Sequence, residues 1–153
     1  MVDFDNAFKR GIQNADVVAK NMGEIDDVLH RLSEQVRAAS DGAITEIVRA
    51  DRTKHVRRGP VELIRDPDLL GTNRRIDYTA LVAIKAGTEP KLEAELCELR
   101  FSPTGYPVSL LFGKRDVACH DKGGLEKGLA SLLEHPDTGA ILKELMAGAD
   151  SHK

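Results

Sequence analysis

The N-terminal part of the chain repeats apolar side chains at alternating spacings of four and three residues, from Phe4 to Ala39. Such spacing places the side chains along one side of an α-helix, in the a/d pattern of a coiled coil. Gly11 is the one interruption. The sequence therefore predicts a long amphipathic, coiled-coil-like helix over residues 1–40. Its predicted interface residues are Phe8, Ala15, Val18, Met22, Ile25, Leu29, Leu32 and Val36.

The predicted helix is too long for the rest of the chain to cover. At about 1.5 Å per residue, a helix of about 36 residues is roughly 54 Å long. The remaining ~114 residues form a globule with a radius of gyration of only about 13 Å. We therefore expect part of the stripe to pack on the same helix of another copy, giving a homodimer or a higher oligomer. The alternative is that the helix covers only its own sheet. Ile12, Ala19 and Val28 widen the stripe, which also favours packing against a sheet or in a larger bundle.

The pattern changes after residue 40 to short extended segments, and we expect residues 41–153 to form a single α+β domain. Residues 91–101 fit either a helix or a strand with a bulge near Leu96, and the turns that bracket them favour the strand. Two short helices follow residue 121, separated by His135-Pro136, and we expect Asp137 or Thr138 to cap the second of them. The predicted fold is α+β, with the long helix, an antiparallel meander of about five strands and two C-terminal helices. The other expected strands are Ile44–Ala50, Val61–Arg65, Arg75–Lys85, Val108–Phe112 and Val117–His120.

Composition narrows the class of protein without identifying an activity. Hydrophobic residues make up 41% of the chain, charged residues 31%, and the formal net charge is −3. Cys97 and Cys119 form neither a C-x-x-C pair nor a zinc-binding spacing. The apolar runs are too short to span a membrane, and the N-terminus lacks the features of a signal peptide. We expect a cytoplasmic protein with no membrane segment, no cofactor and no metal.

A basic connection follows the first expected strand and is a candidate nucleic-acid contact. It contains Arg49, Arg52, Lys54, Arg57 and Arg58. Two such connections on a dimer would grip phosphates at a fixed separation. Acidic neighbours dilute the charge, and no aromatic residue lies among the basic ones.

A set of carboxylates gives a third interpretation. Pro67-Asp68, Asp77 and Glu98, which is followed by Arg100, are weakly similar to the Pro-Asp…Glu-x-Lys arrangement of metal-dependent nucleases. Such a site gathers carboxylates on a divalent ion and uses a lysine to assist the attacking water. Arginine replaces that lysine here, and no family is assigned. Cys119-His120 is not expected to act as a thiolate and its base, because adjacent strand residues point to opposite faces.

These patterns favour a non-enzymatic protein over an enzyme, although they do not decide the question. We expect a protein-binding or regulatory module, such as an inhibitor, an antitoxin-like binder or an assembly factor. It would act as a helix-mediated homo-oligomer that also binds another protein. The alternatives are a nucleic-acid-binding dimer that uses residues 49–58 and a small metal-dependent nuclease.

Overall fold

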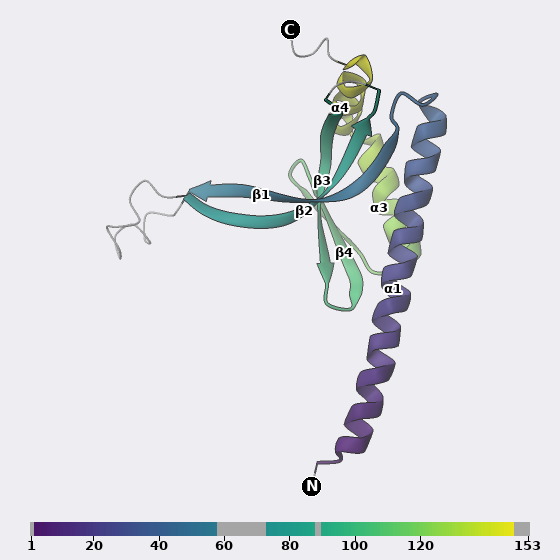
Figure 1. Cartoon of the computed structure of the whole chain (residues 1–153), viewed down its shortest axis with the longest axis vertical. Helices are drawn as coiled ribbons and strands as arrows, with labels where there is room; N and C mark the ends of the chain where they lie inside the picture. Colours follow the sequence, from purple (N-terminus) through teal and green to yellow (C-terminus); the bar gives the residue numbers. More distant parts are fainter. Residues whose placement is uncertain (1, 58–72, 88–89, 149–153) are drawn as a thin grey trace, which may run out of the picture.

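The computed structural model describes residues 2–57, 73–87 and 90–148, and the side chains at 56, 57, 73 and 74 are not described. A long helix is followed by a five-stranded sheet and two short helices, which confirms the predicted α+β fold (Figure 1). The elements are α1 (Phe4–Ala39), β1 (Glu46–Arg57), β2 (Asn73–Lys85), β3 (Leu92–Ser102), β4 (Gly105–Phe112), β5 (Arg115–Cys119), α3 (Lys122–Glu134) and α4 (Pro136–Ala147).

The sheet is an antiparallel meander in which each strand pairs with the next along the chain, in the order β1-β2-β3-β4-β5. The prediction of a strand within residues 91–101 is confirmed, and so is the bulge. Leu81 of β2 pairs with Cys97 of β3, whereas the next residue, Val82, pairs with Glu95. Leu96 is therefore the extra residue, which explains why the apolar alternation changes phase at this point.

Three local predictions differ from the structure. The charged connection, for which the sequence indicates at most a short strand, is paired throughout its described part, because β1 continues through it as far as Arg57 in register with β2. The turn between β4 and β5 is only two residues long, since Phe112 pairs with Arg115. His135, and not Asp137 or Thr138, caps α4, and its side chain accepts a hydrogen bond from the Asp137 backbone N–H. The expected strand Val61–Arg65 lies outside the described residues.

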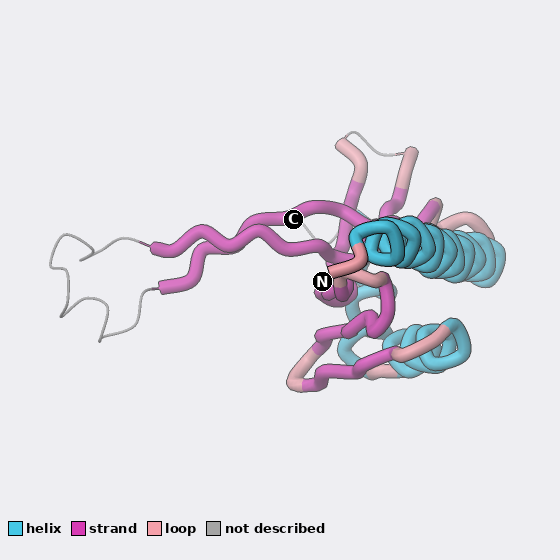
Figure 2. The backbone as a smooth tube through the Cα atoms, turned by 90° about the horizontal axis from the view of Figure 1, so that it is seen from below, coloured by secondary structure: helices cyan, strands magenta, loops and turns pink. Residues whose placement is uncertain are grey.

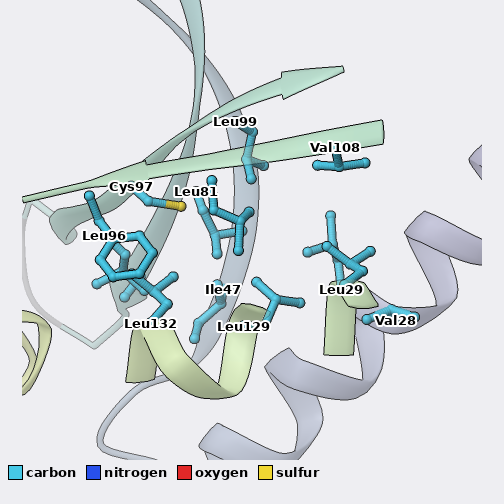
Figure 3. Close-up of a cluster of buried hydrophobic side chains, with 14 of the residues drawn as sticks. Val28, Leu29, Ile47, Leu81, Leu96, Cys97, Leu99, Val108, Leu129 and Leu132 are labelled. Carbon is cyan, nitrogen blue, oxygen red and sulfur yellow. The ribbon is translucent and has the colours of Figure 1, made fainter. Parts of the chain in front are cut away.

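The three helices share one face of the sheet with a single apolar core. The packed half of α1 contributes Ile25, Val28 and Leu29, and α3 contributes Leu125, Leu129 and Leu132. Figure 3 shows Leu29, Leu129 and Leu132 of the helices on the same side as Ile47, Leu81 and Leu99 of the sheet. Each fully buried leucine or isoleucine is worth about 1.5–3 kcal/mol relative to its exposed state, so this layer holds the helices in place.

The ends of α1 are formed as expected from the sequence. The Asp3 carboxylate accepts hydrogen bonds from the backbone N–H groups of Asp5 and Asn6, which would otherwise have no partner. At the other end Asp41 and Gly42 both have a positive φ, at 52° and 81°, and turn the chain into β1. No helix in the described part of the chain is both long and apolar enough to cross a membrane.

Two elements extend beyond this compact layer. The distal part of the β1–β2 ribbon projects sideways (Figures 1 and 2), and β2 pairs with β3 only from Thr79 onward. The N-terminal part of α1 continues past the sheet, and no other described element lies beside it (Figure 1). Part of the predicted stripe therefore does extend beyond the body of its own chain.

The two halves of α1 should respond differently to truncation of an apolar side chain. At a concentration low enough for a monomer, Leu29→Ala should lower the free energy of unfolding by about 2–4 kcal/mol, because it leaves a cavity in the core. Phe8→Ala should change it by less than about 0.5 kcal/mol, because Phe8 is exposed. Urea unfolding followed by circular dichroism measures the free energy of unfolding of both variants. Equal losses of stability in the two variants would contradict the division of α1 into an exposed half and a packed half.

Candidate interaction surface

The predicted interface stripe is divided between the inside and the outside of the chain. Its C-terminal members lie against their own sheet: Ile25 is fully buried, Leu29 is buried, and Met22, Leu32 and Val36 are half-buried around the core. Its N-terminal members do not. Every residue from 2 to 17 is exposed, and Val18 is half-buried. We call residues 4–17 the free segment of α1 and residues 21–36 the packed segment.

The packed segment begins where α1 meets the turn between β3 and β4. Asn21 donates a side-chain hydrogen bond of 2.9 Å to the carbonyl oxygen of Thr104. Gly105 has a φ of 98°, and a Cβ at this position would lie only 2.9 Å from the Cβ of Asn21. Glycine is therefore required both by the backbone conformation and by the closeness of the helix.

A second contact at this junction comes from Tyr106, whose hydroxyl donates a 3.2 Å hydrogen bond to Glu24 of α1. Burial, together with this bond, raises the pKa of Tyr106 to about 12. The phenol therefore stays neutral throughout the physiological range, and this contact holds the helix without a change of charge. The junction marks the boundary between the two segments of α1.

Three large apolar side chains form a row on the free segment. Phe4 is 78% exposed, Phe8 68% and Ile12 53%. They follow one another at intervals of four residues, so they form a continuous ridge along one side of the helix. Ile12 was expected only to widen the stripe, yet it completes this ridge. Val17 is 52% exposed but lies nine residues from Phe8, about 180° away around the helix.

The ridge continues the buried stripe of the packed segment. Phe4, Ala15 and Met22 lie within about 20° of one another around the helix, and Leu29 is close to the same direction. The stripe of Phe4, Ala15 and Met22 therefore continues from the free segment into the packed segment, while Phe8 and Ile12 lie about 40° and 80° from Phe4 around the helix. Exposed apolar residues in a contiguous row mark interaction surfaces more often than isolated ones do.

The basic residues of β1 are held by acidic partners. Arg52 lies 2.7 Å from Glu93, and Lys54 lies 2.8 Å from Glu98. Arg49 pairs with Asp26 of α1 and also lies over the ring of Phe101. These ion pairs reduce the positive charge available to a phosphate backbone. The side chain of Arg57 and all of Arg58 lie outside the described residues, so nucleic-acid binding through them stays a prediction.

The ion pairs of Arg52 and Lys54 belong to a network on the sheet face opposite the helices, whereas Arg49 lies on the helix side with Asp26. Tyr78 donates a 2.8 Å hydrogen bond to Glu95, and Lys54 also lies 4.9 Å from the centre of the Tyr78 ring. Beneath these long side chains, Ala80 and Val82 are buried. The apolar stems of the charged residues therefore cover this face where no helix does.

The proposed nuclease carboxylates are not gathered in the part of the chain that can be described. Asp77 is exposed and lies 3.6 Å from Arg75, whereas Glu98 is bound by Lys54 and Arg100. Within residues 2–57, 73–87 and 90–148, no group of three or more His, Cys, Asp and Glu side chains is arranged to hold a metal ion. Asp68 lies outside the described residues.

The remaining candidates have structural explanations. Cys119 is buried while His120 is exposed, so the two point apart as expected. Burial raises the pKa of the Cys97 thiol to about 12 and also raises the pKa of Cys119, which keeps both thiols protonated. The start of α3 at Gly123-Gly124 is occupied by its own cap, because Asp121 accepts a 2.6 Å hydrogen bond from the Gly124 N–H.

A comparison of the chain with protein-family models, with curated proteins and with solved structures finds no match. Phe4, Phe8 and Ile12 of this ridge are among the few large apolar side chains that are exposed in the described part of the chain, and the interpretation of the ridge rests on physical grounds alone.

The network on the helix-free face predicts how stability depends on pH. Hydrogen bonds from Lys54 and then from Arg100 lower the pKa of Glu98, against the effect of its burial. A lowered pKa in the folded state contributes stability that is present above the ordinary glutamate range and is lost as the pH falls. Glu98→Gln should therefore destabilise the protein by about 1 kcal/mol at pH 7 and by progressively less below pH ~4.

The matched control is Glu134→Gln, at an exposed glutamate that ends α3. The urea midpoint of Glu98→Gln should lie below that of the wild type at pH 7 and approach it at pH 3, whereas the midpoint of the control should match the wild type at both pH values. A Glu98→Gln deficit that stays the same at pH 3 would contradict the assignment of the ion pairs.

Proposed function

We propose that the chain is a non-enzymatic interaction module that forms a homodimer through the free segment of α1. The observation that supports this proposal is the exposed ridge of Phe4, Phe8 and Ile12. A helix of this length gains nothing in its own fold from two phenylalanines on a segment that contacts no other described element. A second copy offers the same ridge and would remove both from water.

The free segment is not expected to be stable as a helix by itself. Helices shorter than about 12–15 residues are marginal in water, and most helices in proteins are stabilised by packing of their apolar face. The free segment continues from the packed segment, which nucleates it, but Phe and Ile are not strong helix formers. Packing against a partner would supply the stability that intrinsic propensity does not.

The dimer would leave the rest of the molecule accessible. The β1–β2 ribbon and the network on the helix-free face lie away from the free segment of α1 (Figures 1 and 2). These surfaces would then be available, in two copies, to another protein. A regulatory or assembly role follows from this arrangement, because two identical surfaces held at a fixed distance bind a repeated target more tightly than one.

Sedimentation velocity over a range of concentrations tests the proposal. As the concentration increases, the apparent mass of the wild type should rise from the 16.7 kDa of one chain towards twice that mass. Phe4→Ser combined with Phe8→Ser should weaken the dimer by at least ~100-fold, because it removes four rings from the interface, and each buried ring is worth about 2 kcal/mol. The variant should keep the circular dichroism and urea midpoint of the monomer.

Val17→Ser is the matched control, because Val17 is similarly exposed but lies on the opposite side of the helix. It should dimerise like the wild type. A wild type that stays monomeric at about 100 µM would overturn the proposal, and so would an equal loss of association in the control.

A further inference from the structure

We propose that the two phenylalanine rings of the free segment pack against Gly11 and Ala15 of a second copy that runs in the opposite direction. This inference rests on the proposed function and names the surface that the ridge occupies. Phe4 of one copy would lie opposite Ala15 of the other, and Phe8 would lie opposite Gly11. The two-fold axis would pass between residues 9 and 10.

The first argument is the size of the side chains along the stripe. The free segment has two large residues at its N-terminal end, Phe4 and Phe8, followed by two small ones, Gly11 and Ala15. In an antiparallel pair each large residue meets a small one. In a parallel pair phenylalanine meets phenylalanine, whereas glycine meets glycine across a gap. Close packing therefore favours the antiparallel pair.

The second argument is Gly11 itself. Glycine within a helix is destabilising relative to alanine, so its presence needs a reason. Within the described part of the chain no contact requires a glycine here, since a Cβ added at Gly11 would meet nothing within 4 Å. The φ of Gly11 is also helical, so no turn requires it. A ring from a second copy over this position supplies the reason, because the missing side chain leaves space on the face that carries the ridge.

The third argument is the position of the sheet and α3, which pack on α1 from residue 21 onward. The stripe of the free segment continues on the face that the packed segment turns towards its own sheet. A parallel partner that followed this face would run into the sheet and α3 of the first copy beyond residue 21. An antiparallel partner does not. Residue 4 of the partner lies opposite Ala15, before the junction at Asn21, and the partner's own sheet lies beyond the other end of the overlap.

This geometry also limits the assembly. Both copies use the same surface, so the interface is isologous and closes on itself as a dimer. The overlap of residues 4–15 spans only about 18 Å at 1.5 Å per residue. Such an interface is small, and we expect a dissociation constant on the order of micromolar to tens of micromolar.

Gly11→Leu distinguishes the two orientations by the sign of its effect. In the antiparallel dimer the new side chain takes the place of the Phe8 ring, and the dissociation constant should rise about tenfold or more. In a parallel dimer leucine would fill the gap between the two glycines, and the dissociation constant should fall. Gly23→Leu is the matched control, because Gly23 also has nothing within 4 Å but lies about 120° away around the helix.

Cysteine cross-linking tests the register directly. A mixture of the Phe4→Cys and Ala15→Cys chains should form a disulfide between the two variants, while Ala15→Cys alone should not. In the proposed pair two copies of residue 15 are about 16 Å apart along the axis, too far for a disulfide. Cys97 and Cys119 are buried and should not compete.

The measurement should use a concentration well above the wild-type dissociation constant, because Phe4→Cys removes one ring. Cross-linking of Ala15→Cys with itself, or a tighter dimer for Gly11→Leu, would overturn the antiparallel pair while leaving the dimer intact. A wild type without any dimer would instead remove the proposed function, so the two failures are distinguishable.

Discussion

The position of α1 depends on the burial of its C-terminal half against the sheet, and the rest of the structure follows from that contact. Ile25, Val28 and Leu29 enter the same core as the sheet and α3, while the junction at Asn21 and Gly105 ends the packed segment. The helix is 36 residues long, so its first half has no surface of its own chain to cover. A stripe with one continuous pattern therefore serves two different neighbours, the sheet and, in our proposal, a second copy.

The face of the sheet that carries no helix is covered by long charged side chains. The helices lie on one side only, and Ala80 and Val82 on the opposite side are nevertheless buried. The long side chains of the ion-pair network cover them, with Arg52, Lys54 and Tyr78 bound to glutamates of β3. Exposed ion pairs are individually weak, but here they also shield small apolar residues. Arg52 and Lys54 of β1 are therefore explained as part of the cover of this face.

Much of the fold could be predicted because local patterns and tertiary structure agree. The spacing of the stripe predicted α1, and the phase change at Leu96 predicted the bulge in β3. Where the prediction was wrong, tertiary contacts decided the outcome. The charges of residues 51–57 indicated a connection with at most a short strand, yet pairing with β2 extends β1 through them as far as Arg57. His135 caps α4 because Pro136 can begin a helix, which places the cap two residues before Asp137.

The candidate surface was predicted less completely than the fold. Periodicity shows which residues share a face, but it does not show how much of that face the chain covers itself. Met22 and Phe8 are equivalent in the pattern, and only the position of the β3–β4 turn separates them. The role of Gly11 could not be predicted from the sequence either. Its position interrupts the apolar stripe, but only the structure shows that there is empty space beside it.

Amide hydrogen exchange as a function of protein concentration tests the central claim most directly. The account predicts that protection of residues 4–15 rises as the concentration passes through the dissociation constant, while protection of residues 22–36 stays the same, because the packed segment is already buried in the monomer. Protection of residues 4–15 that does not depend on concentration would contradict the account, and so would an equal rise over the packed segment.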